Sequence, residues 1–328
     1  MKLGTLALSF GLVMGAATFT SAHAAKIIKL GHYNSDTNAQ HIALTECFKK
    51  HIEEKTNGRY EIRIYPSNQL GSEDQVINGM RNGTIEAGVT GLLMQNTDPM
   101  FGVWEWPFLM KDIDHARRVF KSDAAKMVAD KLSEYGIKHL AWGINGFRVI
   151  SANRTIAKMD DFKGLRLRVP PNSMFIDWGN AMGANPQSMP LPEVFTALEQ
   201  KVIDAQENPY ALLKESGLYE VQSDVLESNH MFTPGMLQMS LKTWERLSDE
   251  DKAIFEEAAA LYQERQWELA TAAVVAVKES LQKEGNIKIT VPSAEFRDAM
   301  VKAVQPMYEA YYEKYPWAKE FVSKVNAM

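Results

Sequence analysis

The stretch KIIKLGHYNSDTNAQHIALTECFKKHIEEKTNGRYEIRIY, residues 26–65, holds two strand patterns on either side of a helix pattern. The helix is closed by Asn57-Gly58, as a C-cap should be, and the second strand alternates in polarity and stops at Pro66. A helix and a third strand follow directly. A β-α-β-α-β order with short loops predicts an α/β domain with a largely parallel sheet. The predicted elements are strand 26–30, helix 39–56, strand 60–65, helix 73–82 and strand 86–90.

A second series of strand and helix patterns lies further along the chain and predicts a second α/β unit of similar size. It shows no obvious sequence repetition of the first unit. The Gly-rich residues 143–146 open no helix and are interpreted as a crossing or hinge. The predicted elements of this unit are strands 139–144, 147–151, 165–169 and 202–206 and helices 174–182 and 191–200.

The longest helical pattern runs from Ser248 to about Glu284. Ser248 and Asp251 form a capping box, and Gly285 ends the pattern. At ~1.5 Å per residue such a helix is about 55 Å long, which is enough to span a two-domain protein. The alternative is two helices broken near Thr271. A last strand over residues 287–291 precedes C-terminal helices rich in Tyr and Lys.

Residues 1–24 have the pattern of a cleaved secretion signal. Lys2 gives a positive start, an apolar Gly/Ala-rich run follows, and Ser21 to Ala24 place small residues at the cleavage positions. A transmembrane anchor is the alternative, but the run is interrupted by Gly, Ser and Thr and is short for a bilayer span. We therefore expect an exported, periplasmic protein.

Length and charge narrow the function classes. Without the leader, 328 − 24 = 304 residues remain, more than one hydrophobic core usually organises. The formal charge of −5 becomes −6 when Lys2 is removed, and no basic tract is present, which argues against nucleic acid as a partner. Cys47 is the only cysteine, so no internal disulfide forms, and its apolar setting favours a small buried residue over a nucleophile.

Enzyme signatures are missing from the chain. The histidines are scattered without metal-ligand spacing, and there is no GxSxG elbow, no Gly-rich phosphate loop and no GxGxxG after a strand. We therefore expect a non-enzyme with no catalytic residues, no metal and no cofactor.

A basic strand offers the most informative chemistry. In LRLRV, residues 165–169, side chains alternate, so Arg166 and Arg168 share one face and the apolar residues share the other. Open α/β sheets bind ligands at the carboxyl ends of their parallel strands. The face that carries the two arginines reaches such an end. The alternative is that both arginines are solvated surface charge.

Three stretches together resemble one family, the DctP family of solute-binding proteins of tripartite (TRAP) transporters. They are FRVISANRTIAKMDDFKGLRLRVP (147–170), MPLPEVFTALEQKVIDAQENP (189–209) and YPSNQLGSE (65–73). The similarity covers essentially the whole chain after the leader, in the same order, and includes the long helix.

The resemblance implies an anion site on the second domain. Its central residue is the arginine before Val-Pro, here Arg168, which in relatives forms a two-pronged salt bridge with the ligand carboxylate. Arg148 matches the family's second arginine, and Asn208 in QENP matches an asparagine that binds the same anion.

The first domain is expected to close over the rest of the ligand. Trp104 and Trp106 lie where the family has an apolar wall. Whether Trp106 lines the pocket or packs in the core stays open. Relatives that bind large sugars such as sialic acid often carry an acidic group near Gly91; none stands near it in the sequence, which favours a compact ligand. The predicted contacts are His32, Tyr33, Glu73, Thr90 and Trp106.

The fold implied is a flytrap of the periplasmic-binding-protein type, with two α/β domains joined by hinge strands and a long domain-spanning helix. Its expected ligand is a small organic anion, a C2–C6 carboxylate or a short sulfonate. The expected partners are the small and large membrane subunits of a TRAP transporter, which the monomeric protein would supply without ATP. Alternatives with the same pocket are a sensory protein or a component of an ATP-driven importer, and a periplasmic enzyme is a further one. The predicted domains are 25–145 with 234–272, 146–233 with 273–301, and C-terminal helices 302–328 packing across both.

Overall fold

The computed structural model describes residues 24–284 and 287–328, so the predicted secretion signal lies outside the described residues except for Ala24. Within this part of the chain the strands join into one continuous sheet, in the order β2-β1-β3-β9-β4-β7-β5-β6, with β8 and β10 attached beside β4. The strands are β1 Lys26–Gly31, β2 Tyr60–Tyr65, β3 Ala87–Thr90, β4 Ile137–Ala152, β5 Arg166–Val169, β6 Asn185–Ser188, β7 Ala205–Pro209, β8 Asp224–Leu226, β9 Phe232–Ser240 and β10 Lys288–Thr290.

The sheet has two parallel regions joined by long antiparallel strands. At one end β1 pairs in parallel with β2 and β3, and at the other β5 pairs in parallel with β6 and β7. We call residues 26–106, which carry β1 to β3, the first lobe, and residues 153–228, which carry β5 to β8, the second lobe. Between them β4 and β9 run antiparallel, and β4 also pairs with β7 and β8. The two-unit α/β fold is confirmed, whereas the domain boundaries stay a prediction.

The crossing between the lobes is a single strand. The sequence predicts two strands over residues 139–144 and 147–151, but β4 runs through both as 16 residues. Its pairing with β9 shifts register between Ile144 and Gly146, and Gly146 has a φ of +101°, which a side chain would strain. The predicted break is therefore a β-bulge within one strand, and residues 143–146 do form a crossing.

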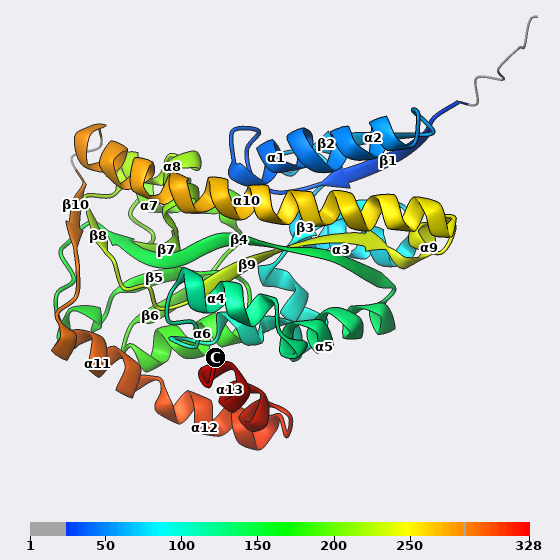
Figure 1. The fold of residues 1–328 in the computed structure, drawn as a ribbon. Coiled ribbons are helices and arrows are strands. Elements are labelled where there is room, and N and C mark those ends of the chain that lie inside the picture. The colour runs from blue at the N-terminus through cyan, green and yellow to red at the C-terminus, as the bar shows by residue number, and fades with distance from the viewer. Residues whose placement is uncertain (1–23, 285–286) are drawn as a thin grey trace, which may run out of the picture.

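The helices pack on the faces of this sheet (Figure 1). Helix α3 has the predicted bounds, a capping box between Ser72 and Gln75, and a left-handed Gly83 at its end. The predicted helix 39–56 is continuous but has a π-helical middle, η1. The other short η segments are 3-10 helices. The helical segments are α1 Ala39–Ala43, η1 Leu44–Lys49, α2 Lys50–Lys55, α3 Glu73–Asn82, η2 Leu92–Asn96, η3 Pro99–Glu105, α4 Ile113–Phe120, α5 Asp123–Lys131, η4 Leu132–Tyr135, η5 Met159–Phe162, α6 Ser173–Ala181, η6 Leu191–Glu193, α7 Val194–Glu199, α8 Tyr210–Glu215, η7 Leu218–Val221, α9 Leu241–Trp244, α10 Asp249–Glu284, α11 Ala294–Ala303, α12 Gln305–Lys314 and α13 Ala318–Asn326.

Helix α10 is unbroken over 36 residues and runs across both lobes, so the alternative of a break near Thr271 is wrong (Figure 1). It is bonded to the crossing strand. Gln266 accepts from Ile144 N at 2.8 Å and donates to Ile144 O at 2.7 Å, and the Trp267 indole donates to Trp142 O at 2.8 Å. These contacts satisfy the backbone of β4 next to its bulge, so the helix braces the crossing.

The C-terminal helices form the opposite side of the molecule from α10 (Figure 1). In α12, Tyr308 donates to Pro107 O at 2.9 Å and Tyr311 donates to Asp177 of α6 at 2.7 Å. Cys47 is half-buried against the apolar residues of α2 and β1. None of the helices in residues 24–284 and 287–328 has the length and apolar character needed to cross a bilayer.

Candidate ligand-binding cleft

A cleft of about 840 Å³ lies between the two lobes and is floored by α10. Its volume falls in the range of pockets that enclose small organic molecules. The first lobe contributes mainly polar side chains, the crossing strand β4 contributes Arg148, the second lobe contributes Arg168 among prolines, and α10 contributes small apolar residues. The lining includes Tyr33, Asn34, Thr37, Asn38, Asn68, Ser72, Glu73, Asp74, Leu93, Asn145, Arg148, Arg168, Pro170, Pro190, Asn208, Lys214, Glu215, Thr233, Ala270, Ala273, Val274 and Val277.

Arg168 presents an open edge to this cleft. It stands on β5 and is 2% exposed, and its Nε and Nη2 both donate to the Met189 carbonyl, at 2.9 and 2.7 Å. One carbonyl oxygen thus occupies one edge of the planar guanidinium. The edge formed by Nη1 and Nη2 keeps two parallel N–H donors, and Nη1 has no hydrogen bond to any residue in the described part of the chain. That edge matches the two oxygens of a carboxylate.

The charge of Arg168 is only partly neutralised. Burial lowers its pKa to about 10, with Glu207 acting in the opposite direction, so the guanidinium is protonated at neutral pH. Among the described residues no carboxylate lies within ion-pair distance of it. A buried cation without a contacting counter-ion favours an anionic ligand.

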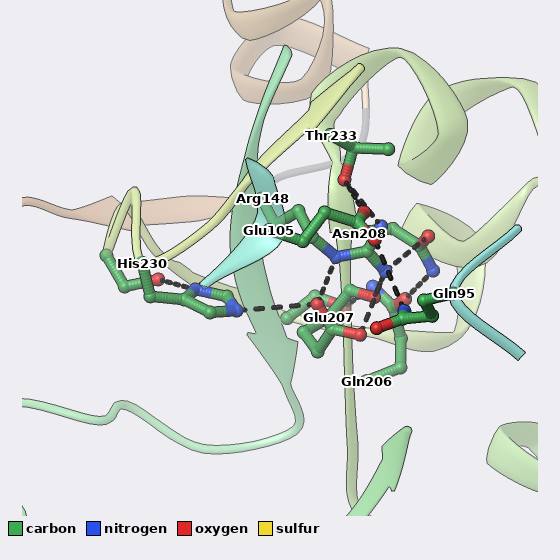
Figure 2. Close-up of polar contacts among 10 residues, drawn as sticks. Gln95, Glu105, Arg148, Gln206, Glu207, Asn208, His230 and Thr233 are labelled. Carbon is green, nitrogen blue, oxygen red and sulfur yellow. Dashed lines mark hydrogen bonds and ion pairs between the residues drawn. The ribbon is translucent and has the colours of Figure 1, made fainter. Parts of the chain in front are cut away.

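Arg148 lies beside it but is already paired (Figure 2). Its Nε donates to Glu207 Oε2, and its Nη2 donates to Glu207 Oε1 at 2.8 Å and to Asn208 Oδ1 at 3.1 Å. Burial alone would lower the pKa of Arg148, but the Glu207 carboxylate outweighs it and raises that pKa. Arg148 therefore lines the cleft as half of an ion pair, and a ligand carboxylate would share it with Glu207.

The strand order brings the predicted anchor residues together. Arg148 on β4, Asn208 on β7 and Arg168 on β5 stand on three consecutive strands and all line the cleft. Asn208 Nδ2 donates to Gln206 Oε1 at 2.6 Å, which fixes its amide orientation. The convergence of these three residues on one ligand group stays a prediction.

A buried polar chain continues behind Arg148 on both sides (Figure 2). His230 Nε2 lies 3.4 Å from Glu207 Oε2, and its ring stacks on Trp178 at 4.2 Å. On the other side Arg148 Nη1 donates to Thr233 Oγ1 at 3.1 Å, and Thr233 donates to Glu105 Oε1 at 2.9 Å. These bonds orient Arg148 and connect it to η3 of the first lobe.

Of the contacts predicted on the first lobe, Tyr33 and Glu73 line the cleft. The Tyr33 hydroxyl accepts from Asn145 Nδ2 at 2.5 Å. Glu73, at the start of α3, accepts on Oε1 from Gly91 N at 2.7 Å and from Leu93 N at 3.2 Å. Burial raises the pKa of Glu73 to about 7, although the two backbone donors act against that shift.

The bond from Gly91 to Glu73 corrects one expectation. No acidic residue stands near Gly91 in the sequence, yet the carboxylate of Glu73 lies against its backbone N–H. Glu73 and Gly91 are 18 residues apart in the sequence, so local sequence patterns could not predict this contact. The lack of an acidic residue near Gly91 in the sequence therefore no longer favours a compact ligand.

Three predicted contacts do not line the cleft. His32 is 2% exposed and its Nε2 lies 3.1 Å from His41 Nδ1, and Thr90 is fully buried and donates to Gln238 at 2.7 Å. Trp106 is 3% exposed and packs against Tyr308 and other aromatic rings of the C-terminal helices. His32 follows β1 and Thr90 ends β3, whereas Trp106 follows η3, and all three side chains point to the interior. Trp104 is likewise a core residue, stacked edge-on against Phe120, Trp142 and Phe321.

Sequence reasoning missed the amide-rich first-lobe wall and two contacts across the cleft. Asn38 Nδ2 donates to Glu215 Oε1 of α8 at 2.7 Å, and Asn172 Nδ2 donates to Asn96 Oδ1 of η2 at 2.7 Å. Both bonds join the first lobe to the second. Asparagines are ordinary turn residues, so nothing local in the sequence marks Asn38 as a cleft residue or predicts the bond between Asn172 and Asn96.

Two α/β lobes, crossing strands braced by a long helix and a cleft between the lobes that presents the open edge of Arg168 define a two-lobed solute-binding protein. The chain belongs to the bacterial extracellular solute-binding proteins of family 7, the DctP family, whose profile matches residues 30–315.

Relatives extend over nearly the whole chain. A TRAP periplasmic solute-binding protein from Haemophilus influenzae, solved with bound L-gulonate, is 62% identical, covers 92% of this chain and 99% of its own, and superposes with a TM-score of 0.90. A sugar-acid-binding protein of Advenella mimigardefordensis in complex with galactonate is 31% identical, covers 92% and 97%, and has a TM-score of 0.87. The sialic acid-binding periplasmic protein of Vibrio cholerae is 31% identical over 97% of both chains. The relatives named for a ligand are binding proteins.

Proposed function

We propose that this protein captures a sugar acid, a hydroxylated monocarboxylate, in the periplasm and delivers it to the membrane subunits of a TRAP transporter. The observation that carries the proposal is the Nη1–Nη2 edge of Arg168, open toward an amide-lined cleft. The edge takes the carboxylate, and the opposite wall takes the hydroxylated chain.

The chemistry of the first-lobe wall supports a ligand with several hydroxyl groups. The Asn34 amide donates to Gln40 at 2.8 Å and keeps its Oδ1, while the Asn68 side chain makes no hydrogen bond to any described residue. Amides both donate and accept, as hydroxyls do, so the two kinds of group pair well. A short sulfonate would reach Arg168 but would leave these amides unpaired, which costs binding energy when the cleft closes.

The comparisons point the same way. The 62% identical H. influenzae structure holds L-gulonate, and the more distant A. mimigardefordensis structure holds galactonate. Both are six-carbon acids with a hydroxyl on each carbon beyond the carboxylate. We therefore place the ligand of this protein in the same class.

Capture would follow the flytrap principle. A ligand held by Arg168 on one lobe and by the first-lobe wall on the other stabilises the closed form through contacts that the open form lacks. The bonds from Asn38 to Glu215 and from Asn172 to Asn96 add to that closed form. The closed monomer would then dock on the small and large membrane subunits, which use an ion gradient.

Calorimetry of three arginine variants with L-gulonate, galactonate and D-glucuronate tests the anchor. Arg168→Ala should cost about 3–5 kcal/mol, more than 100-fold in Kd, because a buried carboxylate loses its partner. Arg168→Lys should recover little, since an ammonium cannot reproduce two parallel donors. Arg166→Ala is the matched control: the same strand carries it, but it pairs with Asp204 at the surface. Unchanged affinity in Arg168→Ala would refute the proposal.

Uptake into vesicles tests delivery. The small and large membrane subunits of a TRAP transporter from the same organism would be reconstituted, and labelled gulonate uptake measured with wild-type protein and with Arg168→Ala. Uptake that needs the wild-type protein and an ion gradient is the expected result. Uptake that needs ATP instead would contradict a TRAP partner.

A further inference from the structure

The two walls of the cleft carry opposite charge. On the second lobe and the crossing strand, the lining includes Arg148, Arg168 and Lys214, together with Glu215, whose Oε1 accepts from Asn38 of the first lobe. On the first lobe, the ionisable lining residues besides Tyr33 are Glu73 and Asp74, and no cation of residues 26–106 lines the cleft. A ligand that spans the cleft therefore meets cations at one end and carboxylates at the other.

Glu73 is the carboxylate best placed to act on a ligand. The N–H groups of Gly91 and Leu93 hold its Oε1, whereas its Oε2 has no hydrogen bond from any residue that the structure describes. The side chain is thus fixed in orientation and keeps one oxygen as an acceptor without a donor. Asp74, the next residue, is exposed and makes no such contact with the backbone of η2.

We propose that Glu73 is a specificity-determining residue that excludes ligands with a second carboxylate at the end facing the first lobe. The cleft would then accept hydroxylated monocarboxylates and reject aldaric acids and C4-dicarboxylic acids. The inference rests on the proposed function, because it assumes that the first carboxylate binds at Arg168.

The physical reason is the pairing of donors and acceptors. A terminal hydroxyl donates to Glu73 Oε2, while a terminal carboxylate is acceptor-only and brings a like charge. Two unit charges about 6 Å apart at an effective dielectric constant of ~20 would disfavour binding by on the order of 100-fold if both stayed ionised. Because the pKa of Glu73 is about 7, it can take up a proton on binding, which limits the exclusion at pH 8 to about 10-fold. A terminal ammonium would relieve the charge, but it cannot accept from the amide of Asn68, whereas a hydroxyl can.

The exclusion should weaken in acid. Burial raises the pKa of Glu73 to about 7, and its charged and titratable neighbours are Asp74 on the same helix, Tyr33 after β1 and Glu105 on η3. Tyr33 stays neutral through this range, because burial raises its pKa far above neutrality. Below pH 7 Glu73 is increasingly protonated, so its carboxyl can donate to a second carboxylate.

The test is calorimetry with a matched pair of acids, L-gulonate and D-glucarate. Glucarate has the same carbon chain, with the terminal CH2OH replaced by a carboxylate. Wild-type protein at pH 8 should bind gulonate about 10-fold more tightly than glucarate, and the ratio should fall to within about 2-fold at pH 5.5, where Glu73 is protonated. Glu73→Gln should bring the ratio to within about 3-fold at both pH values. Glu61→Gln is the matched control, since Glu61 pairs with Arg63 at the surface and does not line the cleft, and it should leave the ratio near the wild-type value.

Each outcome separates the two proposals. If wild-type protein binds glucarate as tightly as gulonate at pH 8, or if Glu73→Gln keeps the ratio, the inference is overturned while the proposed function stands. If wild-type protein binds neither acid, the proposed function itself fails. Tighter binding of 6-aminohexanoate than of gulonate would overturn the assignment of a hydroxylated tail. The pH dependence is measured on wild-type protein, so it decides the matter even if Glu73→Gln does not fold.

Discussion

Replacing Glu207 by Gln removes the charge beneath Arg148 while it keeps the size and shape of the side chain. The Glu207 side chain is 0% exposed and that of Arg148 is 3% exposed, so no solvent can take over the lost charge. Breaking a buried ion pair by neutralising one partner costs about 3–5 kcal/mol. That is a large share of the ~5–15 kcal/mol by which domains are usually stable.

The expected loss can be stated as a melting temperature. For a chain of about 300 residues the entropy of unfolding is roughly 0.6 kcal/mol per degree, so the variant should melt about 5–8 °C lower. Calorimetric scanning at pH 7 without ligand measures it. Asp204→Asn is the control, since its partner Arg166 has a side chain 42% exposed and solvent screens the pair. We expect a much smaller shift for that control.

The pH dependence gives the prediction a second readout. Burial would raise the pKa of Glu207, but Arg148 and His230 outweigh it and hold the pKa below its usual value. A carboxyl with a lowered pKa contributes stability above its ordinary pKa and loses it as the pH falls through the folded value. The gap between wild type and Glu207→Gln should therefore be full at pH 7 and close below about pH 4.

A double variant, Arg148→Gln with Glu207→Gln, completes the cycle. Its loss should be smaller than the sum of the two single losses, because each single variant leaves an unpaired charge. If Glu207→Gln melts no lower than Asp204→Asn, or if the losses simply add, the ion pair does not have the role we assign to it.

Three further predictions concern other parts of the molecule. Burial raises the pKa of Glu105 to about 8, so its protonated form stabilises the fold below pH 4.5 and that contribution is lost as the pH rises toward 8; Glu105→Gln should flatten the fall in melting temperature between pH 5 and pH 8, and an unchanged slope would refute this. Trp106→Ala should cost about 3–5 kcal/mol of stability in urea titration and leave the Kd for gulonate unchanged, whereas a large loss of affinity would place the ring at the ligand. Asn38→Ser keeps an N-cap acceptor for Gln40 N but loses the bond to Glu215, worth ~1 kcal/mol, so Kd should rise about 5-fold and small-angle scattering should show a larger radius without ligand; no change in either would mean that this bond does not assist closure.

Local patterns predicted most of the first lobe. The alternation in YEIRIY gives β2, and the cap signals around residues 72–83 give α3 with its observed ends. The sustained period after Ser248 gives α10. These elements have one face toward the core and one toward solvent. Their apolar residues therefore recur at the helix or strand period.

Of the two central strands, β9 was missed for the opposite reason. FTPGMLQMS, β9, is buried at all nine positions, so no alternation appears, and its Pro and Gly read as a loop. In β4 the glycines of residues 143–146 suggested two strands where a bulge joins one. The short β6, NPQS, has no strand pattern and forms because it pairs with β5.

The site divides in the same way. Alternation in LRLRV, with the resemblance to known binding proteins, was enough to select Arg168, because its neighbours must face the core. Position after a strand end was not enough for His32 or Thr90, since it does not determine which way a side chain points. Asn38 and Glu215 stand 177 residues apart, and only folding brings them within 2.7 Å.

The sequence alone indicated an exported, acidic chain. It also placed arginines on a ligand-facing edge of an α/β sheet. Only the tertiary structure decided which arginine keeps an open edge. Arg148 pairs with Glu207, 59 residues away, and Arg166 pairs with Asp204, 38 residues away, while Arg168 bonds only to a backbone carbonyl among residues 24–284 and 287–328. Charged side chains pair through space across strands that only the fold brings together. The local hydrophobic period of the chain carries no information about such partners.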